Sequence, residues 1–164
     1  MKLGDIEFLV KIGEKKLEEY DTTIRGNEVN CWVPSEEGKN FNIRCINDSP
    51  DQAIVCAVKI DGRDADQMLL NPGTTADEWG VWTASDTLLP YVFSRIQLSD
   101  DDTLHEQCAN QAMVHLGSIR LAIYRIKTEE DRDPSEPWRA PESVPQSIGP
   151  VHERSKKVVH IVSL

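Results

Sequence analysis

Apolar residues alternate with polar ones in many short segments of this chain, and this period of two constrains the fold more than any other feature. In residues 117–127, for example, Ile119, Leu121 and Ile123 fall on one face of an extended segment. Alternation of this kind is typical of β-strands with one buried face. The other segments that we interpret as strands are 5–13, 16–21, 28–34, 41–46, 54–60, 67–70, 79–84, 87–98 and 157–163.

Turn residues separate these segments and help to define the fold class. Asp61-Gly62 is a dipeptide typical of a tight hairpin turn, and Asn71-Pro72-Gly73 ends the segment before it. Pro90 lies inside one predicted strand, which indicates an edge strand or a bulge. One short helix is predicted at residues 103–114. Many short strands and one helix favour a single-domain antiparallel β-sandwich of the jelly-roll or immunoglobulin-like type, with a β-barrel as the alternative.

The composition changes after residue 127, and this change predicts the domain organisation. Residues 128–150 hold five of the nine prolines, at positions 134, 137, 141, 145 and 150. A core strand does not accommodate prolines at this spacing, so we interpret the segment as an extended strap or linker. The predicted organisation is a sandwich core at 1–127, the strap at 128–150, and a C-terminal strand at 151–164. That strand packs on the core or on a neighbouring copy.

The charge of the chain excludes some classes of partner. The sequence has 28 acidic and 18 basic residues, a formal net charge of −10. This surplus argues against nucleic acid as a partner, because a nucleic-acid-binding protein presents a basic face to the phosphates. No apolar run approaches the roughly 18 residues of a membrane-spanning helix. Asp5 and Glu7 interrupt the first apolar segment, so we expect no signal peptide and an intracellular location, cytoplasmic or nuclear.

The sequence offers no catalytic or metal-binding constellation. Nucleophile-elbow, phosphate-loop, dinucleotide-binding and zinc-protease motifs do not occur, and the four cysteines and four histidines lack the paired spacings of a zinc site. Residues 61–66 resemble a calcium loop only superficially, because the glycine is second rather than sixth. We therefore expect no cofactor and no metal, and find no argument for an enzyme. The cysteines are interpreted as buried free thiols rather than disulfides.

The four tryptophans carry much of the large apolar area of the chain. Trp32 follows a cysteine in a predicted strand, where we expect it to pack. Trp79 and Trp82 lie three residues apart, so they face opposite sides of a strand and one of them should be outward. Trp138 lies in the proline-rich segment, where it either anchors the strap or binds a partner. The candidate partner- or ligand-binding residues are Trp79, Trp82, Trp138, Asp61 and Arg63.

Several segments of the chain carry a resemblance to a known family. They are residues 17–21 (LEEYD), 31–39 (CWVPSEEGK) with Phe41, 61–63 (DGR), 90–94 (PYVFS), 117–119 (GSI) with Tyr124-Arg125, and 153–157 (ERSKK). Together, and in this order, they resemble an uncharacterised fungal domain family that is common in basidiomycetes. The resemblance implies a fungal, intracellular protein. It implies no activity and no functional residues, because none are defined for the family.

We carry two main classes of function. A third, an enzyme whose acid–base pair is drawn from scattered carboxylates, is less favoured because no spacing singles out such a pair. We expect a non-catalytic protein-interaction module, whose partner is another protein or a second copy that exchanges the C-terminal strand. The alternative is a small-ligand or carbohydrate-binding sandwich that uses an exposed tryptophan as a stacking platform.

Overall fold

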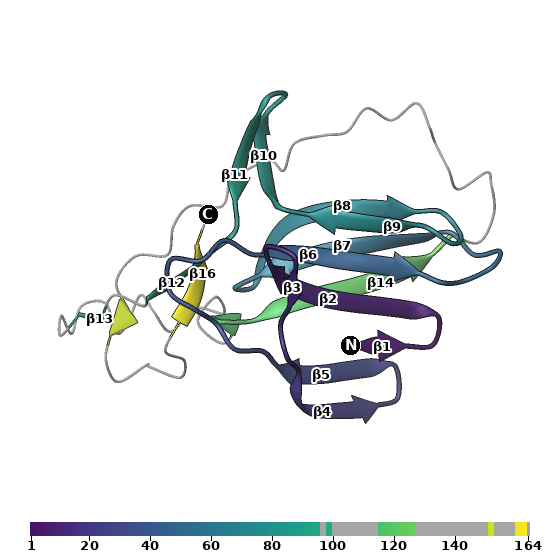
Figure 1. The fold of residues 1–164 in the computed structure, drawn as a ribbon, viewed down its shortest axis with the longest axis horizontal. Helices are drawn as coiled ribbons and strands as arrows, with labels where there is room; N and C mark the ends of the chain where they lie inside the picture. The colour runs from purple at the N-terminus through teal and green to yellow at the C-terminus, as the bar shows by residue number, and fades with distance from the viewer. Residues whose placement is uncertain (96–97, 100–114, 127–150, 153–159, 164) are drawn as a thin grey trace.

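The computed structural model describes residues 1–95, 98–99, 115–126, 151–152 and 160–163 of the 164-residue chain. These residues form two main β-sheets, with two hairpins beside them (Figure 1). All strand pairings within the two main sheets are antiparallel, and neither sheet closes on itself. The prediction of a mainly β, antiparallel sandwich is therefore confirmed. The alternative is wrong for this part of the chain, because the described strands form no closed barrel.

The first sheet is built around the alternating segment near the start of the chain. Its two central strands are β2 and β6, and they place Phe8 directly opposite Cys45. Directly opposed residues share one face of an antiparallel pair, so both side chains point into the core. The strands in spatial order are β1 (Lys2–Leu3), β2 (Ile6–Ile12), β6 (Asn42–Asn47) and β9 (Thr75–Glu78), with β3 (Lys15–Lys16) paired to β2.

The second sheet contains two of the clearest alternating segments. Its central strand is β7, which pairs with β14 on one side and with β8 on the other. A β-bulge interrupts the β7–β8 ladder between Val58 and Lys59 and leaves Asp66 directly opposite Val58. The strands are β14 (Ile119–Arg125), β7 (Ile54–Ile60) and β8 (Arg63–Leu70), so β8 begins earlier than the predicted strand at 67–70.

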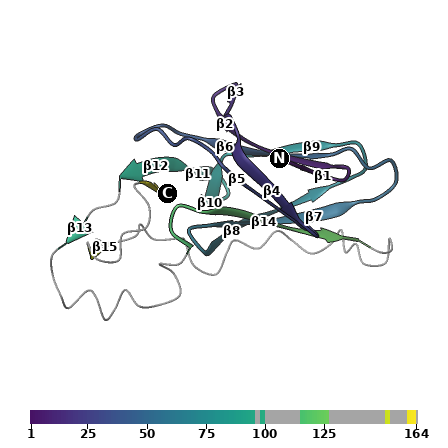
Figure 2. The same cartoon turned by 90° about the horizontal axis from the view of Figure 1, so that it is seen from below.

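The hydrophobic core lies between the two sheets, which form two layers in the view of Figure 2. Alternate side chains of β2, β6, β7 and β8 fill it. Aromatic rings extend it, because the Phe41 ring centroid lies 4.4 Å from that of Phe93 and 5.4 Å from that of Tyr91. The buried hydrophobic residues of this core cluster are Ile6, Phe8, Val10, Leu17, Phe41, Ile43, Cys45, Ile54, Cys56, Val58, Ile60, Ala65, Met68, Leu70, Val81, Tyr91 and Phe93.

Two hairpins lie outside the main sheets. β4 (Tyr20–Arg25) pairs with β5 (Glu28–Trp32), and β10 (Gly80–Ala84) pairs with β11 (Thr87–Pro90). In Figure 1 the β4–β5 hairpin lies at the lower edge of the molecule and the β10–β11 hairpin at the upper edge. The sandwich therefore presents two separate hairpins at its periphery.

Two further pairings join segments that are distant in the chain. β12 (Val92–Arg95) pairs antiparallel with β16 (His160–Ser163), and β13 (Leu98–Ser99) pairs parallel with β15 (Val151–His152). The last strand predicted from the sequence thus lies against β12 of its own chain.

The predicted turn at Asp61-Gly62 is confirmed. Both residues have positive φ angles, 51° and 78°, as a type I′ hairpin turn requires. A Cβ atom on Gly62 would also lie 3.0 Å from the Cβ atom of His115. The turn therefore needs glycine for its backbone conformation and for space.

Two strand boundaries are wrong, and β1, β9 and most of β4 were not predicted. The segment 16–21 is not a return strand, because the chain leaves the sheet after β3 and buries Leu17 before β4 begins. The segment 87–98 is divided at Tyr91, whose backbone N–H donates to Trp79 outside the β10–β11 ladder. β9 was missed because Thr75-Ala76-Asp77-Glu78 has no apolar alternation.

Some predictions fall on residues outside the described part of the chain. These are the helix at 103–114, the proline-rich segment at 128–150, Cys108 and Trp138. Cys45 and Cys56 are buried free thiols, as predicted, whereas Cys31 is a free thiol that is only partly buried. Within the described residues, no helix has both the length and the apolar character that crossing a bilayer requires.

Candidate functional site

The β4–β5 hairpin carries the two most exposed large apolar side chains among the described residues, Trp32 and Ile24, and a third exposed one, Tyr20. Trp32 is 68% exposed, Ile24 63% and Tyr20 48%. Tyr20 lies directly opposite Trp32, so the two rings share one face of the hairpin, whereas Ile24 lies opposite Val29 on the other face. We call these three exposed side chains, Tyr20 and Trp32 on one face of the hairpin and Ile24 on the other, the hairpin surface. Side chains of this size and type are usually buried, so their exposure on one hairpin marks a candidate interaction surface.

The exposure of Trp32 corrects a prediction. The sequence suggested that this residue packs inside the protein. In the structure Val33, one position further along, packs against the core, and Cys31 is partly buried. Because successive side chains of a strand point to opposite faces, Trp32 points outward. The prediction is wrong because a large aromatic residue was expected to be buried whatever its phase in the alternation.

The same hairpin has an open strand edge. β4 pairs with β5 and with no other strand among the described residues, and all of its side chains are exposed. Free N–H and C=O groups along such an edge are a template for another strand. A bulge between Tyr20 and Thr23, with Asp21 at a φ of 51°, distorts β4 beside the aromatic pair. The bulge interrupts the regular edge of β4 and so shortens the stretch that is open to pairing, which limits indiscriminate pairing with other strands.

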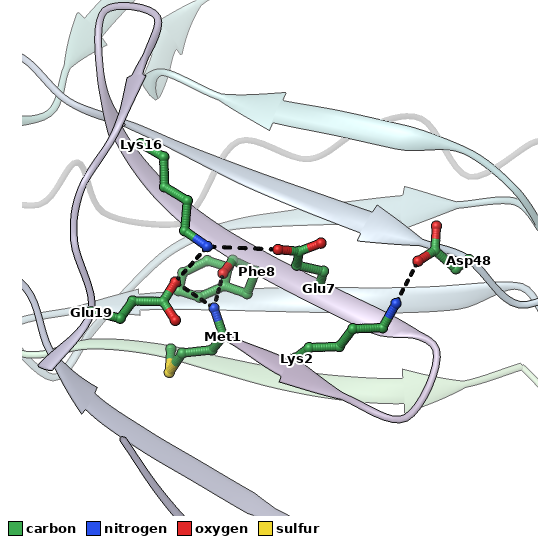
Figure 3. Close-up of polar contacts among 7 residues, drawn as sticks. All are labelled: Met1, Lys2, Glu7, Phe8, Lys16, Glu19 and Asp48. Carbon is green, nitrogen blue, oxygen red and sulfur yellow. Dashed lines mark hydrogen bonds and ion pairs between the residues drawn. The ribbon is translucent and has the colours of Figure 1, made fainter. Parts of the chain in front are cut away.

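An ion network fixes the root of the hairpin (Figure 3). The Met1 ammonium group donates a 2.6 Å hydrogen bond to the Glu19 carboxylate. The Lys16 ammonium nitrogen lies 3.2 Å from Glu19 and 3.7 Å from Glu7 on β2. Glu19 immediately precedes Tyr20, so the network ties the first residue of β4 to the first sheet.

The electrostatics of Glu19 show that this network favours the ionised carboxylate. Burial by itself would raise the pKa of Glu19, but hydrogen bonds from the Met1 ammonium and from Lys16 outweigh it and hold the pKa below its ordinary value. Leu17 is buried beside this segment, and its backbone N–H donates to the carbonyl of Val10 at 2.8 Å. The hairpin therefore leaves the sandwich from a fixed point.

The two tryptophans that the sequence singled out lie at the other hairpin. Trp79 precedes β10 and is 45% exposed, and Trp82 lies within β10 and is 39% exposed. Trp82 is opposite Leu88, and a bulge follows before Ala84. Both tryptophans are exposed, whereas the sequence required only one of them to face outward.

An acidic pair lies directly before this hairpin. Glu78 is opposite Ile43 in the β6–β9 ladder, so its side chain faces the core, and it is only 8% exposed. Asp66 is opposite Val58 and faces the same interior from the second sheet. The two carboxyl groups are hydrogen-bonded to each other, and Glu78 also accepts hydrogen bonds from the backbone N–H groups of Gly80 and Trp79.

The acidic pair holds a proton near neutral pH. Burial, followed by the charge of Asp66, raises the pKa of Glu78 to about 7. The Tyr91 hydroxyl is buried and has no hydrogen-bond partner among the described residues. Burial, and then the charges of Glu78 and Asp66, raise the pKa of this phenol as well. The arrangement can take up or release one proton, but Glu78 faces the core rather than a space where a substrate would bind.

The remaining candidates from the sequence are on other elements. Asp61 is buried in the β7–β8 turn, where its carboxylate accepts a 2.5 Å hydrogen bond from the backbone N–H of Gly117. Arg63 begins β8 and is partly exposed. The structure thus places Asp61 and Arg63 at the β7–β8 turn and Trp79 and Trp82 at the β10–β11 hairpin, and Asp61 has a structural contact in the turn. Within the described ranges, no three His, Cys, Asp or Glu side chains are grouped so that they could hold a metal ion.

Sequence reasoning missed the hairpin surface and the acidic pair. The alternation in residues 28–34 already placed Trp32 opposite Val29, Cys31 and Val33, and this phase was the signal of its exposure. No comparable signal exists for Glu78, because its burial depends on pairing with β6, more than thirty positions earlier in the chain. From its neighbours in the sequence alone, a carboxylate in a polar tetrapeptide is expected to be exposed.

Comparison with known proteins places the chain in a family. Residues 5–162 match the model of a domain of unknown function, DUF7918. No curated protein and no solved structure is significantly similar to the chain. The match spans nearly the whole sequence, including both hairpins and both sheets. The chain therefore belongs to the DUF7918 family of domains of unknown function.

Proposed function

We propose that this domain is a non-catalytic protein-interaction module that binds an extended, basic segment of a partner protein along the β4–β5 hairpin. The observation that carries the proposal is the exposure of Tyr20, Ile24 and Trp32 on a hairpin with an open strand edge. Tyr and Trp are enriched among the residues that dominate interface affinity. An open edge adds main-chain hydrogen bonds to an extended partner.

The charge of the hairpin supports a basic partner. Within residues 18–32, Glu18, Asp21 and Glu28 are exposed acids, against one exposed base, Arg25. The whole chain carries a formal charge of −10. Complementary charge increases the association rate and favours partners of opposite sign. Binding should therefore weaken as the salt concentration rises.

The fixed root of the hairpin supports a preorganised site. Glu19 is held by Met1 and Lys16, so Tyr20 starts β4 from a defined position. A surface that is already ordered loses less conformational entropy when it binds. This favours binding to a short extended segment, which has little area with which to offset such a loss.

Peptide selection tests the proposal. A phage library of random 12-residue peptides is selected against the full chain, and enriched peptides are measured by fluorescence anisotropy. We expect peptides with Lys or Arg beside alternating apolar residues. Trp32→Ala should weaken their binding by about 30-fold, the equivalent of roughly 2 kcal/mol for an interface hot spot.

The matched control is Trp82→Ala, which removes an exposed tryptophan from the other hairpin. It should leave peptide binding unchanged. Enriched peptides that bind Trp32→Ala as tightly as the unaltered chain, or a selection that enriches none, would contradict the proposal. Circular dichroism verifies that both variants keep the β-structure.

A second copy of the chain is the other partner in this proposal, through exchange of the C-terminal strand. β16 pairs with β12 over four positions, from Val92 opposite Ser163 to Arg95 opposite His160. The same register is open to the β16 strand of a neighbouring copy. Light scattering at increasing concentration should then show a dimer that is lost when residues 151–164 are deleted. A strict monomer in both cases would count against exchange.

Ligand binding at the β10–β11 hairpin is the second candidate function, favoured by the exposure of Trp79 and Trp82. Exposed aromatic rings can stack on the apolar face of a sugar. A glycan array followed by thermal-shift measurement separates this function from peptide binding. A specific ligand should raise the melting temperature, and Trp82→Ala, rather than Trp32→Ala, should abolish the shift.

A further inference from the structure

Two cysteines meet in the centre of the core, and each comes from a different sheet. Cys45 lies in β6 of the first sheet and Cys56 in β7 of the second. Both are fully buried, and their Sγ atoms are 3.0 Å apart, in hydrogen-bond contact. The two thiol groups therefore form a direct side-chain contact between the two sheets.

The surroundings of the pair are apolar. Cys45 is opposite Phe8 in the neighbouring strand β2, and Cys56 is opposite Met68 in β8 and Ile123 in β14. These neighbours offer no charged group that would stabilise a thiolate. The hydrogen bond to Cys45, and then burial, raise the pKa of the Cys56 thiol. The same hydrogen bond lowers the pKa of the Cys45 thiol, against the effect of burial. Both sulfur atoms are shielded from solvent in the folded protein.

The short distance between the sulfur atoms points to a modification. A disulfide bond is about 2.05 Å long, so closing this contact requires the sulfur atoms to approach by roughly 1 Å. We propose that Cys45 and Cys56 are a redox modification site, at which a low-molecular-weight disulfide such as oxidised glutathione forms a covalent bond between the two sheets. This site is independent of the hairpin surface.

The reaction balances through two exchange steps. The thiolate of one cysteine attacks the disulfide of the oxidant and forms a mixed disulfide, and one glutathione thiolate leaves. The second cysteine loses its proton and attacks the protein sulfur of the mixed disulfide, and the second glutathione leaves. The two cysteines are oxidised, the glutathione disulfide is reduced to two thiols, and the two protons pass to the departing glutathione thiolates.

Burial predicts when the bond forms. Oxidised glutathione cannot reach fully buried sulfur atoms in the closed sandwich, so exchange proceeds during folding or through local opening. Once formed, the bond closes a loop of about a dozen residues and constrains the unfolded chain. For a domain of this size the expected rise in melting temperature is roughly 5–10 °C.

The spacing of cleavage sites makes the test direct. Trypsin cuts after Arg44 and Lys59, so both cysteines lie in the single peptide 45–59. The full chain is denatured and refolded with reduced and oxidised glutathione, alkylated under denaturing conditions, digested and weighed. We expect peptide 45–59 to be lighter by two hydrogens and to carry no alkyl group. After reduction it should carry two alkyl groups, and the melting temperature should fall.

Two variants separate this pair from the other thiols. Cys31→Ala is the matched control and should leave the internal bond and the rise in melting temperature intact. Cys56→Ala should leave Cys45 alkylated and abolish the rise. Peptide 45–59 with two alkyl groups after oxidative refolding, or with links to Cys31 or Cys108 instead, would overturn the proposal. If Cys56→Ala does not fold, the mass of the unaltered peptide still decides the question.

Discussion

The carboxyl groups of Glu78 and Asp66 are hydrogen-bonded to each other across the gap between the two sheets. Glu78 comes from β9, the edge strand of the first sheet, and Asp66 comes from β8, the edge strand of the second. The contact joins the two layers at one side of the core, and a hydrogen bond between two carboxyl groups requires a proton. The stability of the sandwich should therefore depend on pH near neutrality.

The first prediction concerns the pH dependence that Glu78 creates. Its pKa rises from 4.5 to about 7 on folding. Between these values the unfolded chain loses the proton while the folded chain keeps it, so the folded state becomes less stable as the pH rises. Above pH 7 this pKa difference lowers the free energy of unfolding by roughly 3 kcal/mol. Glu78→Gln, which cannot ionise, should be more stable than the unaltered chain at pH 8 and nearly equal at pH 4.5.

Urea unfolding followed by tryptophan fluorescence between pH 4.5 and 8 measures this effect. Glu28→Gln is the control, because Glu28 is an exposed acid on β5. It should leave the pH profile unchanged. A Glu78→Gln variant that is destabilised equally at every pH would contradict the prediction. It would mean that the carboxyl group contributes to packing and that its ionisation does not destabilise the folded state.

The second prediction concerns Asp77, a carboxyl group whose pKa is lowered on folding by its ion pair with Arg44. Arg44 donates two hydrogen bonds to Asp77, at 2.7 and 2.6 Å, and these hold the pKa of Asp77 below its ordinary value of 3.8. Asp77→Asn should lower the free energy of unfolding by about 1–2 kcal/mol at pH 7, because the pair is bidentate and partly buried. The unaltered chain should lose this advantage only as the pH falls below 3.8.

The exposed pair of Lys59 and Asp64 is the matched control for Asp77. Its distance is 2.8 Å, but the Asp64 side chain is 78% exposed. Asp64→Asn should therefore change the unfolding free energy by less than about 0.5 kcal/mol. Equal effects of the two substitutions would mean that burial does not strengthen the Arg44–Asp77 pair.

The third prediction concerns the Tyr91 hydroxyl. It is buried without a hydrogen-bond partner among the described residues, while its ring stacks on Phe41. A buried polar group without a partner costs about 1–3 kcal/mol. Tyr91→Phe should therefore raise the midpoint of thermal unfolding and leave the ring stacking intact. Tyr91→Leu is the comparison that loses the stacking and should be destabilised. A lower midpoint for Tyr91→Phe would indicate a partner for the hydroxyl.

The fourth prediction concerns Gly80 at the start of β10. A Cβ atom there would lie 2.0 Å from the carbonyl oxygen of Leu89, well inside van der Waals contact with backbone. Gly80→Ala should destabilise the protein by roughly 2 kcal/mol or more, because β11 must move away. Ala84→Val, an exposed change in the same hairpin, should have little effect. Calorimetry measures both, and equal melting temperatures for the Gly80 and Ala84 variants would contradict the prediction.

Much of the fold could be predicted because its signals are local. The alternation in residues 54–60 corresponds to β7, and the turn at Asp61-Gly62 joins it to β8. The segment 117–127 contains β14, which pairs with β7 from a distant part of the chain. Strand character depends on neighbouring residues, whereas the identity of the partner strand does not. The order of strands in the sheets therefore could not be predicted from the sequence.

The candidate site was predicted less well than the fold. Trp79 and Trp82 were identified from residue type and spacing, and both are exposed. Trp32 was assigned to the interior, although the phase of its own strand pointed outward. Glu78 carried no signal at all, because the strand that buries it lies in a segment without apolar alternation.

The amino-acid sequence by itself determined where the chain extends, where it turns and which side of each strand is apolar, since these properties arise from steric and hydrophobic preferences over a few residues. Only the tertiary structure decided that Glu78 faces Asp66, that Cys45 touches Cys56, and that β4 keeps an open edge. Each of these facts depends on which distant strands lie side by side. Burial of apolar side chains stabilises that arrangement only when both sheets pack together, so no single segment of the chain determines it.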